Sequence, residues 1–376
     1  MIESWTSYRL KDLGKWNGGG TPSKANALFW GGDIPWVSPK DMHARVISDS
    51  EDKITNEAVS GSSTKMCPAG SLLFVTRSGI LQKRLPVAIT NRAVAINQDL
   101  KALVVDNGFN ASYLLNLFEF TNQRILSQCA KDGTTVESID TNNLLDFKVS
   151  LPPLAEQERI VEILSDADAA IASAERMVQA HADKAKAITS ALLLKIRENS
   201  EGEAPLSHLC RIATGRKDVN EGNPQGQYPF FTCSKEHTFS DTFSFDTEAI
   251  LLAGNGDIGN PKYYSGKFEA YQRTYVLSEF EDISPIFLTE FLDYRLKRII
   301  ARERQDSAMS YIKMTTLTSI KVPVISDELQ EYCVRVFSAL SEERKHTEAL
   351  ATTLKKQKRG LMQQLLTGKL RVPEKV

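Results

Sequence analysis

Two long stretches of the chain carry apolar residues in steps that alternate between four and three positions. The first stretch runs from Glu156 to about Glu198 and contains neither proline nor glycine. Its apolar positions are Ile160, Leu164, Ala167, Ile171, Ala174, Val178, Ala185, Ile188 and Leu192. This period predicts a long helix that pairs with another as a coiled coil, about 64 Å long at 1.5 Å per residue.

The second stretch extends from about Asp327 to Leu366, and Thr367-Gly368 closes it. Its apolar positions are Leu329, Cys333, Phe337, Leu340, Ala351, Leu354, Leu361 and Leu365. Because each helix leaves a globular block and the chain must return, antiparallel pairing is predicted. His181 interrupts the first seam, where a solvent-facing imidazole is favoured over a buried polar residue that sets the helix register.

The blocks outside these helices alternate short β-rich runs with clusters of Gly, Pro, Asn and Ser. Runs such as Ser71–Val75 and Ala249–Leu252 predict strands, while patches near Tyr113–Cys129 and Pro285–Arg302 predict helices. The predicted fold class is α+β, with two mixed α/β domains joined by two long antiparallel coiled-coil helices in pseudo-two-fold arrangement. The predicted boundaries are 1–153 for the first domain, 154–200 for its helix, 201–324 for the second domain, and 325–376 for the second helix and C-terminal tail.

One segment of the chain occurs twice. Each residue of Thr135–Val161 has a counterpart in Ala308–Val334 at a constant step of 173 positions, which is 330 − 157 for Gln157 and Gln330. The step is far longer than the ~20–50 residues of solenoid repeats, so each copy is a domain plus a connector. Two similar domains approximate a two-fold object, which suits duplex DNA or a pair of identical subunits.

Composition is that of an ordinary soluble protein, with 376 residues, 41% hydrophobic and 25% charged. No apolar run approaches the roughly 18 residues of a membrane span, and the first residues do not resemble a signal peptide, so a cytoplasmic location is expected. The five cysteines are scattered without a C-x-x-C pair, which predicts packing residues and no metal site. A net charge of −1 shows no basic surplus, so nucleic-acid binding would depend on local clusters.

The motifs of catalysis are incomplete. Gly254–Gly259 fits G-x-G-x-x-G, but Asn260-Pro261 cannot begin the helix that would hold a pyrophosphate, which favours a polar loop. Leu151–Leu154 lacks the polar and aromatic partners with which an adenine methyltransferase grips a flipped base. The chain is therefore predicted to be non-catalytic on its own and to hold no cofactor, although a hydrolase built on scattered histidines stays open as a minor alternative.

Long hydrogen-bond donors gather in the loops of both blocks. The first block carries them in one hairpin-like stretch, at Arg77, Ser78, Gln82, Lys83, Arg84 and Arg92. The second block carries Arg216, Lys217, Lys235, Lys262, Gln272, Arg273 and Arg304. Such side chains read guanine and adenine edges and bind phosphate. Each alone is well explained as a solvated loop charge, whereas two sets, one in each copy, favour DNA recognition.

Several motifs carry a resemblance to a known family. They are Leu151-Pro152-Pro153-Leu154 followed by Glu156-Gln157, the segment Lys358–Arg371, Gly18–Ser23 with Ile34–Ser38, and Tyr228-Pro229-Phe230. With these motifs, over nearly its whole length, the chain resembles a specificity subunit of a type I restriction-modification system, the HsdS family. The second copy departs at the start of its helix, where Val322-Pro323 replaces the two prolines and Leu329 replaces Glu156.

The resemblance implies that each domain reads one half of a bipartite DNA site, and that the helices set the spacing. It also implies two modification subunits, which bring S-adenosylmethionine, and two restriction subunits. With it, the predicted DNA contacts extend to Thr21, Ser23, Lys24, Ser38, Lys40 and Asn255. The predicted docking residues are Glu156, Gln157, Gln330, Lys358 and Arg359. The alternative is a coiled-coil scaffold whose globular domains bind proteins.

Overall fold

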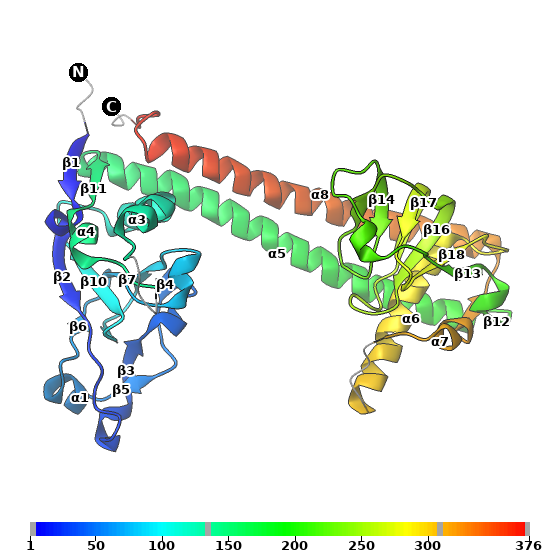
Figure 1. Cartoon of the computed structure of the whole chain (residues 1–376), viewed down its shortest axis with the longest axis horizontal. Coiled ribbons are helices and arrows are strands. Elements are labelled where there is room, and N and C mark those ends of the chain that lie inside the picture. The colour runs from blue at the N-terminus through cyan, green and yellow to red at the C-terminus, as the bar shows by residue number, and fades with distance from the viewer. Residues whose placement is uncertain (1–4, 132–136, 307–310, 373–376) are drawn as a thin grey trace. The chain divides into compact units, whose positions relative to one another are not determined.

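The computed structural model describes residues 5–131, 137–306 and 311–372, with the backbone alone for 301–306 (Figure 1). The chain divides into two compact units, residues 1–173 with 351–376 and residues 174–350. Unit 1 and unit 2 each contain one globular part and one stretch of both long helices, α5 (Leu154–Glu198) and α8 (Asp327–Leu365). The division falls within the helices and not at their ends.

Two sheets and a strand pair build the globular part of unit 1. The strand orders are β2-β10-β7-β8-β4, β5-β3-β9-β6 and β1-β11. The strands are β1 (Thr6–Arg9), β2 (Gly14–Gly18), β3 (Trp30–Val37), β4 (Val46–Ile47), β5 (Lys53–Ile54), β6 (Met66–Cys67), β7 (Leu72–Val75), β8 (Val87–Thr90), β9 (Val94–Ile96), β10 (Leu100–Val105) and β11 (Lys148–Leu151). Every residue of β7 is buried, so the centre of the larger sheet lies inside the core.

Four helices complete this part: α1 (Asn56–Gly61), α2 (Ala111–Phe120), α3 (Asn122–Cys129) and α4 (Thr141–Asp146). Asn110 begins α2 because its side chain accepts a hydrogen bond from the Tyr113 amide. The helix predicted over Tyr113–Cys129 is in fact two helices that meet at Thr121, whose hydroxyl bonds back to the Leu117 carbonyl. The main core joins this layer to the sheet and includes Ile160 and Leu164 of α5 with Leu365 of α8.

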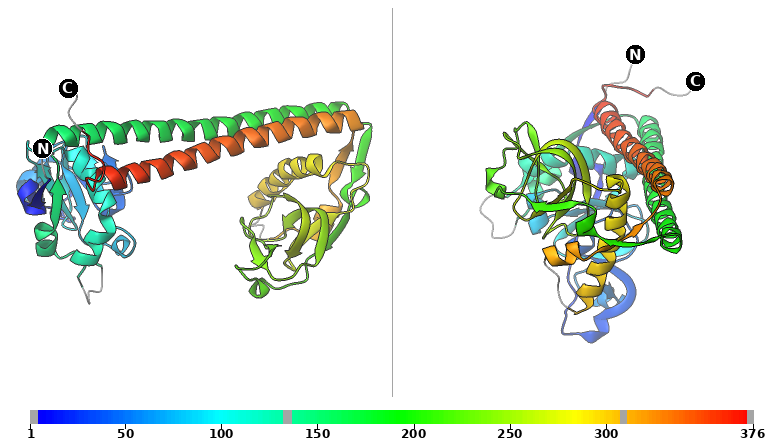
Figure 2. Two further views of the ribbon diagram at one scale, coloured as in Figure 1. Left: turned by 90° about the horizontal axis from the view of Figure 1, so that it is seen from above. Right: turned by 90° about the vertical axis from the view of Figure 1, so that its right-hand side faces the viewer.

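One six-stranded sheet, ordered β13-β18-β16-β17-β14-β15, and a strand pair, β12-β19, build unit 2. The strands are β12 (Gly202–Pro205), β13 (Arg211–Thr214), β14 (Tyr228–Phe231), β15 (Thr238–Ser240), β16 (Phe245–Ala253), β17 (Lys262–Ala270), β18 (Thr274–Ser278) and β19 (Lys321–Val324). The helices are α6 (Pro285–Asp306) and α7 (Met314–Thr318). In Figure 2 the yellow helix α6 lies between the sheet and the helix pair, where Leu288 and Phe291 share a core with Cys333 and Phe337 of α8.

The duplication seen in the sequence is present in the structure of each unit. The antiparallel order β2-β10-β7-β8 of unit 1 recurs as β13-β18-β16-β17 in unit 2. The predicted 173-residue step carries β11 onto β19 and the start of α4 onto the start of α7. The two units therefore share one scaffold, although unit 1 adds a second sheet and unit 2 has one continuous α6.

The long helices are antiparallel within each unit. In unit 1, Asp168 of α5 meets Lys358 of α8, and in unit 2, Lys184 of α5 meets Glu343 of α8. Apolar seam residues such as Leu164, Ala174 and Leu192 are buried, as the heptad pattern predicts.

The favoured interpretation of His181 is wrong. Its imidazole is only 22% exposed, and its Nδ1 lies 3.0 Å from the Thr347 hydroxyl across the seam. Its Nε2 lies 3.6 Å from the Glu343 carboxylate. The side chain is held between the helices because the opposite helix offers polar partners at that level.

Candidate nucleic-acid interface

In unit 1, several loops meet at one edge of the five-stranded sheet, where β2 and β7 end and β10 begins. The Asp99 carbonyl accepts hydrogen bonds from the amides of Thr76 and Arg77, and the Thr76 carbonyl accepts one from Ile139. The Thr21 hydroxyl donates to the Gln98 side chain, which ties a third loop to this edge. We call this surface loop site 1, and its segments are 19–24, 76–84, 97–99 and 137–138.

In unit 2, the corresponding edge gathers the loops after β13 and β16 with the turn before β18. The Arg273 carbonyl accepts from the Gly254 amide at 2.8 Å, and the Gly254 carbonyl accepts from Ile312 at 2.7 Å. The main-chain amide of Gln272 donates to the main-chain carbonyl of Lys217. We call this surface loop site 2, and its segments are 215–218, 233–235, 254–262, 271–273 and 311–312.

The two loop sites are equivalent positions of the duplicated scaffold. Arg77 forms an isolated antiparallel bridge with Ser138, and Asn255 forms the same bridge with Tyr311. The 173-residue step carries Ser138 to Tyr311, so the sequence repeat and the bridges agree. Arg77 of loop site 1 and Asn255 of loop site 2 therefore occupy matching places with different hydrogen-bonding chemistry.

Glycine permits the close approach of chains at both sites. A Cβ on Gly19 would lie 1.9 Å from the Asn97 carbonyl oxygen, and a Cβ on Gly215 would lie 2.0 Å from that of Ala270. Neither backbone leaves room for a side chain, so both glycines hold the first loop against the turn that precedes β10 or β18.

Loop site 2 is hollowed. A depression of about 440 Å³ is lined by Thr214, Gly254, Asn255, Gln272, Arg273, Tyr275, Tyr311 and Ile312. Tyr311 is 54% exposed, and the Tyr275 hydroxyl donates to the Ile312 carbonyl at 2.8 Å. Amide, guanidinium and aromatic groups thus line one depression, which suits a ligand that offers flat rings and hydrogen-bonding edges.

Many of the predicted contacts are exposed side chains of these two surfaces. In loop site 1 they are Ser23, Lys24, Arg77, Gln82, Lys83 and Arg84, with Thr21 and Ser78 partly buried. In loop site 2 they are Arg216, Lys235, Gln272 and Arg273, with Asn255 partly buried. The Gln82 and Gln272 amides reach Glu137 and Asp218 at 3.5 and 3.3 Å.

Three predicted contacts of unit 1 are placed differently. Ser38 is buried and donates to Asp41, while Lys40 pairs with Glu51 and Asp52 at 3.1 and 2.9 Å. These hydrogen bonds, chiefly the one to Asp52, raise the pKa of Lys40. Arg92 lies in the turn between β8 and β9, at the opposite end of both strands from loop site 1. The hairpin-like stretch predicted to hold all the donors together therefore separates Arg92 from the rest.

Two predicted contacts of unit 2 are engaged inside the chain. Lys217 is 22% exposed, donates to the hydroxyls of Ser240 and Thr242, and lies 3.7 Å from the buried Glu269 carboxylate. Lys262 donates to the Ser234 and Lys235 carbonyls. Both ammonium groups therefore bind other segments of unit 2 and hold its loops together.

Arg304 lies in α6, and its side chain falls outside the described part of the chain.

The glycine-rich segment is a turn, as predicted. Gly254–Gly259 connects β16 to β17, with φ of +67° at Gly256 and +84° at Gly259. The strand β17 follows at Lys262, where dinucleotide binding would need a helix.

Two predicted docking residues, Gln157 and Gln330, are buried anchors. The Gln157 side chain accepts from the Asn110 amide at 2.9 Å and donates to the Pro152 carbonyl at 2.9 Å. The Gln330 side chain accepts from the Ser284 amide at 2.8 Å and donates to the Asp282 and Ile325 carbonyls at 3.1 and 3.4 Å. Both side chains are buried, and each amide ties the start of a long helix to its own globular part, so neither offers its side-chain amide on the surface of the described chain.

A third predicted docking residue, Glu156, is also internal. Its carboxylate accepts two hydrogen bonds from the Arg371 guanidinium, at 2.8 and 2.7 Å, and one from the Val372 amide. Burial raises its pKa, but the Arg371 and Val372 hydrogen bonds outweigh this, and the net effect lowers the pKa. Glu156 therefore fastens the C-terminal segment to the start of α5.

The remaining docking residues differ from each other. Lys358 is 14% exposed and pairs with Asp168, whereas Arg359 is exposed on α8.

Some members of the two loop sites were not among the predicted contacts. Gln98, Ser138 and Tyr311 are absent from that set although they lie at the equivalent edges. The repeat itself marks Ser138 and Tyr311 as counterparts, so it contained the signal for this pair. Gln98 had no such signal, because its place depends on the pairing of β10 with β7.

The fold and the two sites define the class of this protein. It is an internally duplicated α+β protein with two domains, a loop site in each copy and antiparallel helices in each unit. The family model of the type I restriction modification DNA specificity domain matches residues 2–179 and 201–356. The chain belongs to this family. None of the described helices is long and apolar enough to cross a membrane.

Curated relatives match part of the chain. It is 46% identical over 160 residues to the EcoR124I/EcoR124II specificity subunit of Escherichia coli, and the matched segment covers 42% of this chain and 40% of that protein. It is 32% identical over 169 residues to the MjaIX specificity subunit of Methanocaldococcus jannaschii, which covers 43% of this chain and 38% of that one. The matches thus span less than half the length of these relatives.

A solved structure is similar over nearly the whole length. The type I restriction-modification S subunit from M. genitalium superposes with a TM-score of 0.60 at 16% identity, over 99% of this chain and 97% of that one. This likeness supports the predicted fold.

Proposed function

We propose that this chain is a DNA sequence-specificity subunit of a type I restriction-modification complex. Loop site 1 reads one half of a bipartite duplex site and loop site 2 reads the other. The observation that carries the proposal is the equivalence of the two loop sites, which place different donors, Arg77 and Asn255, at the same point of one scaffold. A duplicated scaffold with unlike readers suits a split, asymmetric DNA site.

The chemistry of the exposed donors supports readout of base edges. Arginine pairs with guanine through two parallel hydrogen bonds, and asparagine or glutamine pairs with adenine in the same manner. Loop site 1 offers Arg77 and Arg84, and loop site 2 offers Asn255, Gln272 and Arg273. The exposed lysines Lys24 and Lys235 are suited to phosphate, which positions the duplex without reading it.

The remaining functions belong to the assembly. In the proposal the long helices set the spacing between the half-sites and dock two modification subunits, and two restriction subunits complete the complex in the cytoplasm. The chain itself is non-catalytic, and S-adenosylmethionine is held by the modification subunits. Since Glu156, Gln157 and Gln330 are internal, docking falls on exposed groups of the helices, such as Arg359.

The test is selection of bound sequences from a pool of random duplexes by the chain together with a modification subunit. The expected result is one bipartite consensus. Replacing Arg77 by Ala should cost about 1–3 kcal/mol of binding and relax one position in one half of it. Arg92→Ala is the matched control, because Arg92 is exposed at the other end of β8, and it should leave the consensus unchanged. Recovery of no consensus, with tight binding to a protein in place of DNA, would instead support the scaffold alternative.

A further inference from the structure

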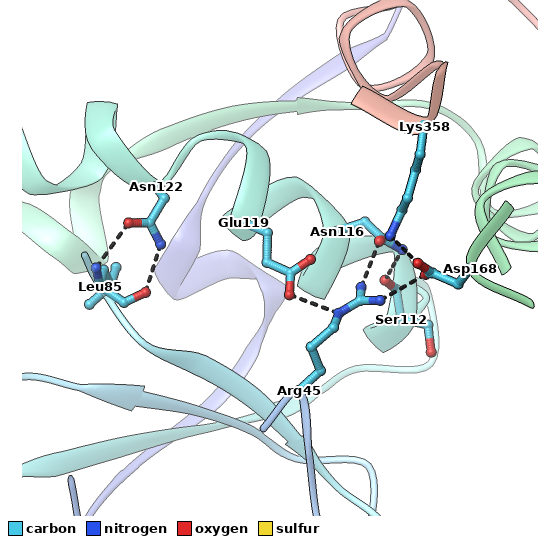
Figure 3. A network of polar contacts seen from close by, with 8 residues as sticks. All are labelled: Arg45, Leu85, Ser112, Asn116, Glu119, Asn122, Asp168 and Lys358. Carbon is cyan, nitrogen blue, oxygen red and sulfur yellow. Dashed lines mark hydrogen bonds and ion pairs between the residues drawn. The ribbon is translucent and has the colours of Figure 1, made fainter. Parts of the chain in front are cut away.

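Arg45 is the centre of a polar network in unit 1 (Figure 3). Its guanidinium donates from Nε to Glu119 at 2.8 Å and from Nη2 to Asn116 at 2.8 Å, both on α2. It also donates from Nη1 to Asp168 of α5 at 2.9 Å. One planar group therefore links two elements in three fixed directions.

The network continues to the second long helix. The other oxygen of Asp168 accepts from Lys358 of α8 at 2.5 Å, and Lys358 is mostly buried. Asn116 is itself oriented, because its amide donates to the Ser112 carbonyl at 2.9 Å. At its other end, Arg45 immediately precedes β4 and is tied to the sheet, since its carbonyl accepts from the Ile89 amide of β8. Sheet, α2, α5 and α8 are thus joined through one side chain.

Magnitudes indicate what this network does. Arg45 and Asp168 are 40% and 39% exposed, and ion pairs so open to water contribute about 1 kcal/mol or less to stability. Most of the adhesion of α5 and α8 to this globular part comes from the core around Leu164 and Leu365, which is apolar and therefore non-directional. The Arg45 network supplies the directional contacts at the level of α5 just beyond Leu164.

The corresponding level of unit 2 is built differently. Stepping 173 residues from Asp168 gives Ser341, and stepping back from Lys358 gives Ala185, so these two positions cannot form an ion pair. The nearby pair of Lys184 with Glu343 joins helix to helix without reaching the sheet. The link from the sheet through Arg45 and Asp168 to Lys358, which we call the Arg45 strut, therefore has no counterpart at the equivalent described positions of unit 2.

We propose that Arg45 is a positioning residue that fixes the angle between the five-stranded sheet, with loop site 1 at its edge, and the helix pair. Resting on the proposed function, this makes Arg45 a determinant of the permitted gap between half-sites, although it lies outside loop site 1. Without the strut, the hydrogen bonds of Gln157 still hold the start of α5, but the sheet can tilt about that point on the apolar contact, and the sharp preference for one gap length is lost.

The experiment uses the full chain with its modification subunits and three duplexes. Each duplex carries the half-sites recovered by selection, with a gap of the native length, one base pair shorter or one base pair longer. For Arg45→Ala, the ratio of affinities for the native and altered gaps should fall about threefold or more, with the half-site sequences unchanged. Arg45→Lys keeps the positive charge but loses the planar guanidinium with its several donors. Its ratio of affinities should lie between that of Arg45→Ala and that of wild type. Asp168→Asn tests the same strut from α5, and Arg176→Ala, an exposed arginine of the same helix, is the control.

The outcomes separate the two proposals. If Arg45→Ala weakens binding to all three duplexes by the same factor, Arg45 only stabilises the fold and the inference is overturned. A wild-type complex that binds its half-sites equally well at all three gaps overturns it too, while leaving the proposed function intact. A wild-type complex with no sequence preference overturns the proposed function and this inference with it. Amide hydrogen exchange of α2 and β8 in each variant shows whether the globular part is still folded.

Discussion

Gln157 and Gln330 show how a single residue type is used twice for one purpose. A glutamine carries an acceptor and two donors on one flexible stem, so it can satisfy an amide and a carbonyl together. Each does so near the start of a long helix. Gln157 binds the Asn110 amide and the Pro152 carbonyl, and Gln330 binds the Ser284 amide and the Asp282 carbonyl. A leucine at either place would fill the space but leave those buried backbone groups unpaired.

The role of such residues could not be predicted from the sequence. The repeat identifies Gln157 and Gln330 as counterparts, but Asn110 is 47 residues from Gln157, and Asp168 is 123 residues from Arg45. No periodicity connects positions so far apart. The sequence therefore predicts Glu156, Gln157 and Gln330 as docking residues, whereas the structure shows that their hydrogen-bond partners lie within the chain.

At the residue scale, the pKa of Glu156 leads to a prediction about acid stability. Its folded pKa lies below the ordinary value of 4.5, so the stability it contributes is present above pH 4.5 and decreases as the pH falls through the lowered pKa. Glu156→Gln should cost about 1–3 kcal/mol of unfolding free energy at pH 7, because the paired Arg371 is left without its carboxylate. The difference from wild type should shrink below pH 4.5.

Denaturant unfolding at pH 7 and at steps between pH 5 and pH 3 measures this difference. Glu158→Gln is the matched control, since Glu158 lies two residues further along α5 and is exposed. A difference between wild type and Glu156→Gln that stays constant down to pH 3 would contradict the assigned role.

At the scale of elements, the periodic apolar patterns of helices and strands could be read from the sequence, whereas the pairing of strands with one another could not. The heptad pattern predicted both long helices to within two residues, and the β-rich runs Ser71–Val75 and Ala249–Leu252 predicted β7 and β16. The prediction that the donors of unit 1 share one hairpin is wrong for Arg92, because Arg92 lies in the turn after β8 and only the pairing of β7 with β8 reveals this. Which strands pair depends on contacts between distant segments, for which one sequence carries no local signal.

The polar interruption of the seam at His181 leads to a prediction about helix pairing. α5 and α8 belong to the two copies of one duplicated segment and share a heptad pattern, so pairing with a second chain's α5 competes with the native pairing; Leu354 stands in α8 where α5 has His181. The His181–Thr347 contact favours the native partner, because a second α5 would present Ala174 at the level of Thr347. His181→Leu should therefore increase self-association of the chain while leaving the seam at least as stable.

Light scattering of wild type and His181→Leu at matched concentrations measures this effect. His346→Leu makes the same change at an exposed position of α8 and controls for added surface hydrophobicity. Equal association of the two variants would mean that the His181 contact does not select the partner helix.

At the scale of the whole chain, the two copies share the same arrangement of strands but carry different side chains in their loops. The order of four strands, the bridge at Arg77 or Asn255, and the buried glutamine are the same in both units. The exposed side chains at the loop sites are not, and the Arg45 strut occurs at one of the two equivalent levels. Family and architecture could thus be predicted from repeated motifs, whereas the exposed side chains of the two loop sites follow no repeat.

If the helix pair sets the gap between half-sites, lengthening both helices together should lengthen that gap. Four residues placed after Ser173 in α5 and four before Ala351 in α8 leave the contacts within each unit intact, since these are the points where the units divide. A paired insertion of four is a stutter, which coiled coils accommodate by local unwinding. It adds roughly 6 Å at 1.5 Å per residue, and DNA rises about 3.4 Å per base pair, so the preferred gap should grow by one or two pairs with both half-sites unchanged.

Inserting into α5 alone should instead misalign Lys184 and Glu343 or Asp168 and Lys358 and destabilise the chain. Mapping of methylated sites in cells that carry the paired insertion gives the result, and a gap that stays the same would assign the spacing to the partner subunits.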